Sequence, residues 1–222
     1  MERTKYHRTY HFPWSFPSKD DKIITDLSCF HGKEVWVGIK MDGECTTGYP
    51  DGSSHARSLD SRHNFTQDWF RRMLSVLRFE IPENHRFVFE NVAYFHSIDY
   101  DDLDSFAYLL SVWEGDWRLS YDECKEFAAC LDLAMPEELY RGTFDEGLLR
   151  DLAKNLDTEK HEGYVVTTTD RVHINDINQN IAKFVREGHV QPNADGKEEH
   201  WLKRTYPNKL TTTRPVKPYY MG

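Results

Sequence analysis

The stretch EVWVGIKMDGECTT, residues 34–47, places a run of apolar and β-branched residues directly before Lys40 and an Asp-Gly pair. Residues 34–40 predict a buried strand. Asp42 and Gly43 predict a tight turn, in which the glycine lets the backbone bend sharply beside a ligand. A lysine at the rim of a core, close to other cations and a metal, holds a neutral amine more often than a lysine in water.

Lys40 is therefore a candidate nucleophile that attacks an α-phosphate. The alternative is a solvent-exposed hairpin turn, because Lys-x-Asp-Gly arises by chance in roughly one chain in twenty of this size.

Two glutamates lie at the boundaries of other predicted strands. Glu90 ends the apolar strand of residues 85–92, and Glu162 stands with a glycine at the start of the strand of residues 161–170. A carboxylate at a strand end can accept the hydroxyls of a ribose or help to hold Mg²⁺. A solvated edge-strand glutamate, or a turn that enters a strand, is the commoner explanation of either residue taken alone.

Cationic side chains occur where a phosphate would need them. Lys183 lies mid-strand in IAKFV (181–185), which predicts an anionic partner such as a phosphate; the alternative is an edge-strand lysine that prevents aggregation. The segment HARSLDSRHN (55–64) contains Arg57 and Arg62, whose guanidinium groups suit bidentate phosphate contacts. A solvated loop explains that segment equally well.

The remaining pattern predicts an α+β fold with antiparallel sheets, since strands and helices alternate without a strict βαβ rhythm. Helices are expected over residues 66–78, 120–133 and 143–157, with N-caps at Thr66, Ser120 and Thr143 and capping boxes in the last two. Further strands are expected over residues 105–116 and 180–186. Residues 1–33 are expected to be irregular, with an apolar hook made of Phe12, Trp14 and Phe16.

Composition limits the function classes. The chain has 222 residues and a net charge of -9, which argues against a tight nucleic-acid binder but less strongly against an enzyme with a local basic cleft. The four cysteines have neither zinc-site nor disulfide spacing, so we expect them to be reduced and the protein to be cytoplasmic. No signal region and no apolar run long enough for a membrane span occurs, so no membrane partner is expected.

The ordered set of motifs resembles the covalent nucleotidyltransferases, which include DNA ligases, RNA ligases and mRNA capping enzymes. A lysine nucleophile, a strand-end glutamate, Glu-Gly before a strand and a mid-strand lysine occur in the order of motifs I, III, IV and V. The chain is most similar to the small bacterial and phage branch of the ATP-dependent RNA ligases, over about residues 8–190, through the segments KMDGECTT, HARSLDSRHN, FENVAYFHSIDY, HEGYVV and AKFVREGHV.

This resemblance implies a nucleotidyltransferase fold of the ligase adenylation type, ATP-grasp-like, with antiparallel sheets flanked by helices. We expect an adenylyltransferase domain over residues 1–190 and a polar, extended and partly disordered C-terminal tail over residues 191–222. Only about thirty-five residues follow motif V, which leaves no room for the OB-fold domain of DNA ligases and capping enzymes.

The resemblance also assigns roles to residues. It implies that Lys40 is adenylylated and that Glu162 holds a metal. Nucleotide contacts are implied for Asp42, Gly43, Arg57, Glu90 and Lys183. Arg62 and Arg186 are candidates for contacts with RNA or its phosphates. The stretch from Arg57 to Arg72 and the basic residues of the tail, among them Lys209, Arg214 and Lys217, are expected to form two phosphate-binding surfaces.

Three positions depart from the family pattern. Cys45 stands where asparagine is expected, and Val185 stands where motif V often has a second lysine, with Arg186 one position later. The aromatic residue that stacks on adenine is ambiguous, because Tyr108 and Leu110 both fall near its place.

The expected function is an ATP-dependent RNA ligase that uses Mg²⁺ or Mn²⁺. It would join 5′-phosphate and 3′-hydroxyl ends through lysyl-AMP and adenylylated-RNA intermediates, in RNA repair. Nicked duplex RNA or an RNA/DNA hybrid is a candidate substrate, and a kinase or phosphatase that heals ends is a candidate partner. The alternatives are a ligase for DNA or mixed nicks, an inactive nucleotide-binding homologue, and a capping-type guanylyltransferase.

Overall fold

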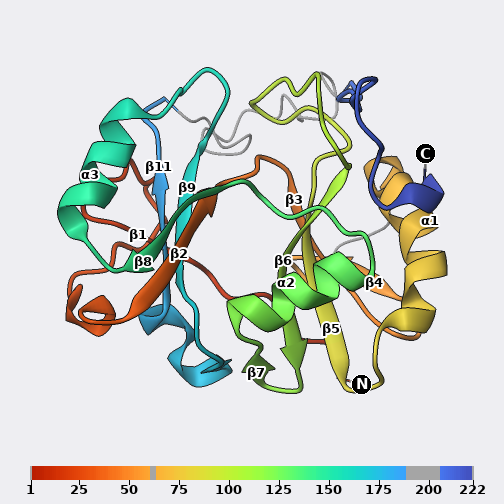
Figure 1. Cartoon of the computed structure of the whole chain (residues 1–222), viewed down its shortest axis with the longest axis horizontal. Coiled ribbons are helices and arrows are strands. Elements are labelled where there is room, and N and C mark those ends of the chain that lie inside the picture. The colour runs from red at the N-terminus through yellow and green to blue at the C-terminus, as the bar shows by residue number, and fades with distance from the viewer. Residues whose placement is uncertain (1, 61–63, 189–205, 222) are drawn as a thin grey trace.

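The computed structural model describes residues 2–60, 64–188 and 206–221, which form two sheets with three α-helices on their outer faces (Figure 1). The first sheet has five strands in the order β1-β11-β9-β2-β8. Its strands are Tyr10–His11 (β1), Ile181–Val185 (β11), Gly163–Thr168 (β9), Glu34–Ile39 (β2) and Glu138–Thr143 (β8). All neighbours are antiparallel except β1 and β11, which run parallel.

The second sheet has six strands in the order β10-β7-β6-β5-β3-β4, and every pair is antiparallel. Its strands are Val172–His173 (β10), Trp117–Arg118 (β7), Ala107–Glu114 (β6), His85–Asn91 (β5), Glu44–Gly48 (β3) and Ser54–Ala56 (β4). The predicted α+β class with antiparallel sheets is therefore confirmed, and the described residues contain no separate OB-fold.

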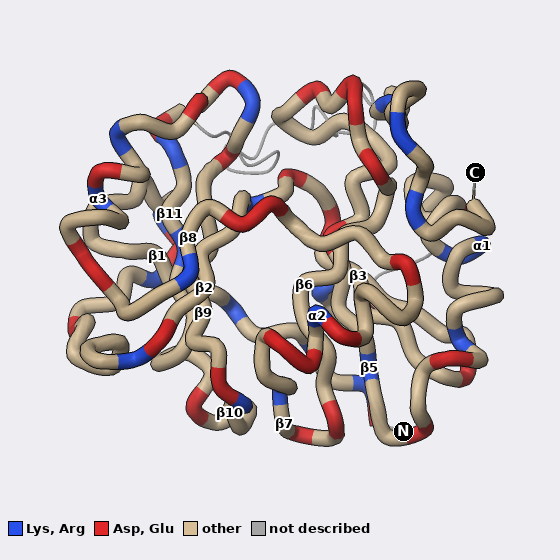
Figure 2. The backbone as a smooth tube through the Cα atoms, viewed as in Figure 1, with Lys and Arg blue, Asp and Glu red and all other residues tan. Residues whose placement is uncertain are grey.

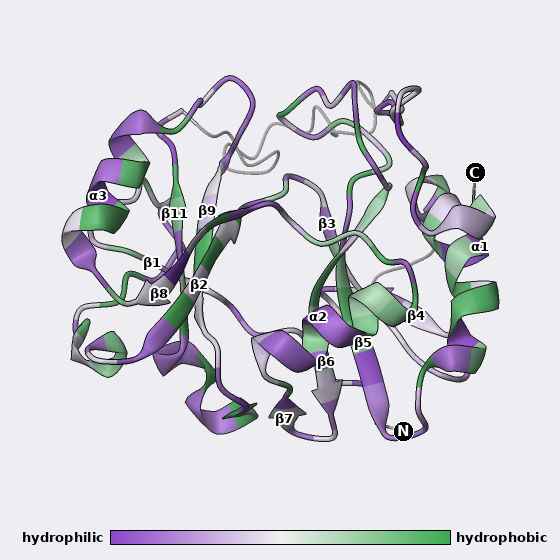
Figure 3. Ribbon diagram, in the orientation of Figure 1, coloured by the Kyte–Doolittle hydropathy of each residue, from purple (hydrophilic) through white to green (hydrophobic). Residues whose placement is uncertain are grey.

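Each helix buries one apolar face against a sheet. Helix α1 (Asp68–Leu77) and helix α2 (Tyr121–Cys130) cover the second sheet, where α1 contributes Trp69, Phe70, Met73, Leu74 and Leu77 to the core. Helix α3 (Glu146–Asn155) covers the first sheet through Leu149. The alternation of apolar and polar positions along α1 and α3 is visible in Figure 3. Apolar periodicity thus fixes which face each helix presents.

Two of the three predicted N-cap residues are wrong. Ser120 caps α2 in a full capping box with Glu123, as predicted. Thr66 is not the cap of α1, because it lies inside a short 3₁₀ turn, Phe65–Gln67, that Asn64 caps. Thr143 belongs to β8, and Asp145 caps α3 by accepting a hydrogen bond from Leu148 N at 3.0 Å. Asp145, a strong cap, thus takes the position at α3, whereas the N-cap residue of α1 is Gln67, which makes no capping hydrogen bond through its side chain.

The N-terminal segment joins the first sheet and carries part of the predicted apolar hook. Phe12 is fully buried and stacks on Trp14 at 4.5 Å, and Trp14 donates a hydrogen bond to the Tyr164 hydroxyl at 2.9 Å. Phe16, in contrast, is half exposed. This packing supports β11, because β1 pairs His11 with Lys183.

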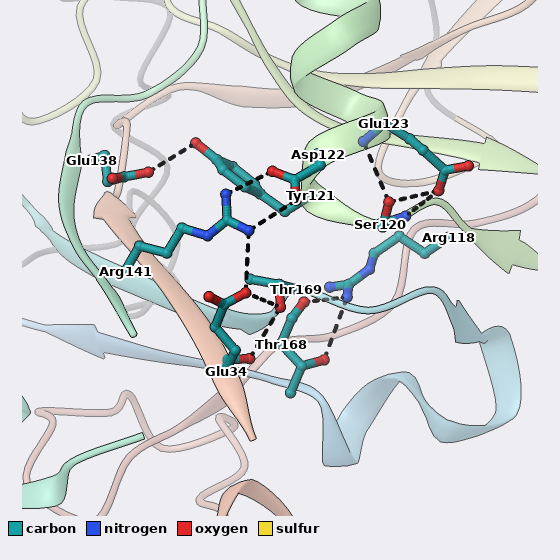
Figure 4. Close-up of polar contacts among 10 residues, drawn as sticks. All are labelled: Glu34, Arg118, Ser120, Tyr121, Asp122, Glu123, Glu138, Arg141, Thr168 and Thr169. Atoms are coloured by element: carbon teal, nitrogen blue, oxygen red, sulfur yellow. Dashed lines mark hydrogen bonds and ion pairs between the residues drawn. The ribbon is translucent and has the colours of Figure 1, made fainter. Parts of the chain in front are cut away.

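Polar contacts connect the two sheets on the side shown in Figure 4. Arg118 is buried and donates to the carbonyl oxygens of Thr168 at 2.6 Å and Asp170 at 3.0 Å. Arg141 on β8 bonds to Asp122 on α2 and to Glu34 on β2. These bonds hold the two sheets in a fixed relation, so a site built from both keeps its geometry.

Residues 206–221 pack against the second sheet and its loops. Asn208 and Thr211 are buried, and Asn208 donates a hydrogen bond to the carbonyl oxygen of Val92 at 2.8 Å. Arg214 forms ion pairs with Asp102 and Asp104. This differs from the extended, partly disordered tail expected from composition, while the expected domain boundary at residues 190–191 lies outside the described residues.

Candidate active site

Lys40 meets Glu162 because β2 and β9 pair antiparallel. The register matches Ile39 with Tyr164, and the Lys40 backbone N–H donates to the Gly163 carbonyl at 2.9 Å. One residue further, the Lys40 ammonium forms an ion pair with the Glu162 carboxylate, whose side chain is only 3% exposed. Motifs I and IV, 122 residues apart, therefore meet in space at the Lys40–Glu162 contact.

The electrostatics around Lys40 differ from the neutral amine expected from the sequence. Burial disfavours the charge, but the carboxylates of Glu162 and Glu90 outweigh it and raise the pKa of Lys40 above its ordinary value. The closest charged partner is a carboxylate, so Lys40 is an ammonium ion beside Glu162.

Two glycines permit close approach of neighbouring backbones in the pocket. A Cβ at Gly43 would lie 2.3 Å from the Asn91 carbonyl oxygen, and one at Gly163 would lie 1.9 Å from the Phe184 carbonyl oxygen. Gly43 does not have a positive φ. It is needed for packing rather than for the sharp bend predicted from the sequence.

Asp42 holds the loop that follows β5. It is 6% exposed, and its Oδ2 atom accepts hydrogen bonds from Ser97 N at 2.6 Å, Ser97 Oγ at 2.8 Å and Ile98 N at 2.8 Å. Its backbone N–H donates to the Tyr100 hydroxyl at 3.0 Å. Sequence reasoning missed these partners, because no local pattern links Asp42 to residues 97–100. Its predicted contact with a nucleotide stays a prediction.

Glu90 faces the same pocket from the second sheet. It lies opposite Cys45, the second residue of β3, and β3 is the strand that follows the turn after Lys40. Burial, partly offset by the charge of Lys40, raises the pKa of Glu90 to about 8, and the nearby Glu162 and Asp42 carboxylates add to the effect. Glu90 is therefore close enough to Lys40 and Glu162 for both charges to affect its pKa.

Lys183 approaches from β11. It pairs with Val165 on β9, and burial together with the neighbouring Lys40 lowers the pKa of Lys183 to about 8. A half-buried lysine beside a second cation fits an anionic ligand between the two.

A buried polar group beside Lys183 was missed from the sequence. His11 Nδ1 lies 2.7 Å from Ser15 Oγ, and its Nε2 lies 3.3 Å from an Asp21 carboxylate oxygen. No sequence motif marks this group, although its three residues lie in one short stretch of the chain.

The remaining predicted residues have different positions. Arg57 follows β4, is exposed, and lies near enough to act on the charge of Lys183. Arg186 follows β11, and its backbone N–H donates to the Glu162 carbonyl at 2.9 Å. Val185 is buried, so this position of motif V supplies no cation here. Arg62 lies outside the described residues.

Two residues were candidates for stacking on a base. Tyr108 is 8% exposed, and its hydroxyl accepts a hydrogen bond from Asp104 N at 3.2 Å. Leu110 is only partly buried and packs with Cys45 and Val165 on the cluster between the sheets. Leu110 is therefore the more accessible of the two.

The carboxylates present fit a magnesium-type ion. Among residues 2–60, 64–188 and 206–221, no group of three His, Cys, Asp or Glu side chains could hold a metal on its own. Mg²⁺ usually binds one or two carboxylates together with substrate phosphates rather than a cage made of protein. Glu162 and Glu90 match that requirement.

Two further expectations concern the whole chain. All four cysteines are free, as predicted. No helix in the described part of the chain is long and apolar enough to cross a membrane.

Solved structures share this architecture. A Naegleria gruberi RNA ligase with PPi aligns over 87% of this chain and 64% of its own, with a TM-score of 0.54 and 16% identity. A putative ATP-dependent DNA ligase from Aquifex aeolicus aligns over 72% of this chain and 45% of its own, with a TM-score of 0.53 and 19% identity. An archaeal ATP-dependent RNA ligase aligns over 72% and 44%, with a TM-score of 0.51 and 12% identity.

This chain thus spans less than two thirds of the length of these ligases. A comparison with curated proteins gives no match. The chain shares its fold with these solved ligases. The family model described as RNA ligase matches residues 33–185, which include Lys40, Glu90, Glu162 and Lys183. The chain therefore belongs to the RNA ligase family.

Proposed function

We propose that this chain is an ATP-dependent RNA ligase that joins 5′-phosphate and 3′-hydroxyl ends. The observation that carries the proposal is the ion pair of Lys40 with buried Glu162, in a pocket that also receives Glu90 and Lys183. A lysine nucleophile, carboxylates for a metal and a second cation for phosphate are what transfer of a nucleotide to lysine requires.

In the first step the Lys40 amine forms a bond to the α-phosphorus of ATP, and pyrophosphate leaves with the electron pair of the broken P–O bond. The ammonium must first lose its proton, and the Glu162 carboxylate, which contacts Nζ, is placed to receive it. Lys183 compensates the charge on the phosphate.

In the second step a 5′-phosphate oxygen of RNA attacks the phosphorus of lysyl-AMP, and the Lys40 amine leaves. In the third step a 3′-hydroxyl attacks the adenylylated 5′-phosphate, and AMP leaves. A divalent metal held by Glu162 and Glu90 would compensate negative charge on phosphate oxygens. A solved structure of a mutant Naegleria gruberi RNA ligase contains ATP and Mn, which supports ATP and Mg²⁺ or Mn²⁺ here.

The experiment is covalent labelling with ATP labelled at the α-phosphate, followed by a denaturing gel. Lys40→Ala and Lys40→Arg should both lose the label, although arginine retains the charge that pairs with Glu162 and so preserves the fold. Lys125→Ala, which changes an exposed lysine on α2, is the control and should label normally. Label that persists in Lys40→Arg rules out Lys40 as the nucleophile.

Substrate choice is tested with strands that are already adenylylated. Pre-adenylylated RNA should be sealed by wild type and by Lys40→Ala, since the first step is complete. Equal sealing of pre-adenylylated DNA would favour the alternative of a ligase for DNA or mixed nicks. We further propose a cytoplasmic role in RNA repair, on nicked duplexes or hybrids whose ends a kinase or phosphatase has prepared.

A further inference from the structure

An open groove of about 780 Å³ lies on the outer side of the second sheet, and Lys40 is not among the residues that line it. Its walls are helix α1 with the 3₁₀ turn before it, the segment after β5, and the C-terminal segment at Pro207. The C-terminal segment runs beside α1 in Figure 1. Nothing in the chemistry of the Lys40 pocket uses this groove.

Aromatic rings line the groove, and one of them is exposed to solvent. Phe65 is 48% exposed and meets Tyr94 edge to face at 5.3 Å. Trp69 and Phe106 form a second perpendicular pair at 5.4 Å. Accessible aromatic faces of this kind stack on unpaired bases of single-stranded nucleic acid.

Two arginines on α1 add positive charge to the same groove. Arg71 and Arg72 are both exposed, and neither forms an ion pair within the described residues. Arg141, Arg171 and Arg214, in contrast, are each bound to carboxylates. Lys and Arg positions along α1 are marked in Figure 2. In a chain with a net charge of -9, adjacent unpaired guanidinium groups favour a polyanion.

Hydrogen bonds connect the groove to the strand that follows Lys40. The Asn91 side chain donates to the Thr66 carbonyl at 3.1 Å, and Gln67 Nε2 donates to Glu44 Oε1 at 2.6 Å. Asn91 is also the residue whose carbonyl packs against Gly43. The groove wall and the turn after Lys40 are therefore joined through the buried Asn91.

We propose that this groove binds an unpaired RNA strand, with bases stacked on Phe65 and Tyr94 and phosphates bound by Arg71 and Arg72. Asp68 also lines the groove, one helical turn before Arg71 and Arg72. This inference rests on the proposed function only in taking RNA as the substrate. It places strand binding on the outer side of the second sheet, separate from the nucleotide pocket.

The test is fluorescence anisotropy of a labelled, unpaired RNA oligonucleotide over a series of salt concentrations. Phe65→Leu keeps an apolar side chain without the ring and should weaken binding at least about fivefold. Arg72→Ala should lower the slope of log affinity against log salt by about 0.7, the value for one phosphate contact on a single strand. Lys125→Ala, on the exposed side of α2, is the matched control and should leave both values unchanged.

Self-adenylylation is measured on the same preparations and should be unchanged in both groove variants, because ATP binds in the Lys40 pocket. Wild-type affinity and salt slope in Phe65→Leu and Arg72→Ala would overturn the proposal, even if the enzyme seals RNA. A wild-type protein that takes no label from ATP would instead refute the proposed function, while the anisotropy result would still decide the groove.

Discussion

Substitutions of Asp42 test which of two roles this residue has: holding the loop at Ser97 and Ile98, or binding the nucleotide. The Oδ2 atom of Asp42 accepts three hydrogen bonds from Ser97 and Ile98. Asp42→Ala removes the acceptor and leaves these donors without it. Asp42→Asn keeps an oxygen that can accept two of them, but removes the negative charge.

The size of the effect follows from burial. Ile98 is 3% exposed, so its N–H cannot reach water without movement of the loop, whereas Ser97 is partly exposed and can be hydrated. One buried donor left without an acceptor lowers the free energy of unfolding by about 1–3 kcal/mol, and the loss of two further hydrogen bonds to a charged acceptor adds a smaller amount. We therefore expect Asp42→Ala to lower the free energy of unfolding by about 2–4 kcal/mol and Asp42→Asn by about 1 kcal/mol.

Urea denaturation gives the stability of each variant, and labelling with ATP gives its activity. If Asp42 acts through the loop, Asp42→Asn should retain most of its labelling, and activity should follow stability across the two variants. Wild-type stability in Asp42→Ala, combined with loss of labelling in Asp42→Asn, would refute the loop role and assign the carboxylate to the nucleotide or metal.

The remaining predictions use other parts of the molecule. Glu162→Ala should lower the rate of adenylylation at least about 100-fold, because the variant lacks a group that stabilises charge in the transition state. Glu162→Asp should recover part of that activity at high Mn²⁺. Near-normal activity of Glu162→Ala in a metal titration would show that Glu162 does not hold the metal. Deleting residues 206–222 should reduce adenylylation and sealing together, because Asn208 and Thr211 are buried in the fold; selective loss of sealing would show instead that the segment only binds RNA. Burial and the charge of Lys183 lower the pKa of His11 to about 4, so the unfolded chain, with a histidine pKa near 6.5, binds a proton first as the pH falls. Stability should therefore decrease by on the order of 1 kcal/mol from pH 7 to pH 5, as measured by urea denaturation, and a His11→Asn variant should lose less over that range.

Strands with alternating or continuous apolar residues could be predicted from the sequence. Strands β2, β5, β6, β9 and β11 all lie within the expected ranges. Strands β3 and β8 were missed for physical reasons. ECTTG (44–48) is short and polar in composition, and its burial comes from packing between β4 and β5. ELYRGT (138–143) is an edge strand whose side chains are all at least partly exposed, so it carries no apolar period.

The predicted site was partly defined by motif order. Lys40, Glu90, Glu162 and Lys183 lie close enough for their charges to act on one another, but the charge state of Lys40 could not be deduced, since it depends on the contact with Glu162. The loop bound by Asp42 and the packed C-terminal segment also lacked a local signal. Both depend on contacts between residues at least 55 positions apart.

The order of strands has a consequence for synthesis of the chain. Strands β3 to β7 of the second sheet are contiguous in sequence, whereas the first sheet takes β1 and β2 from the start of the chain and β8, β9 and β11 from beyond residue 137. Local contacts form faster than distant ones, and domains emerge from the ribosome N-terminus first. Strands β3 to β7 should therefore assemble before β8 and β9, the partners of β2, have been synthesised. Lys40 gains Glu162 only after residue 162 has been made. A shorter nascent chain therefore carries this lysine without the carboxylate that the proposed function uses to accept its proton.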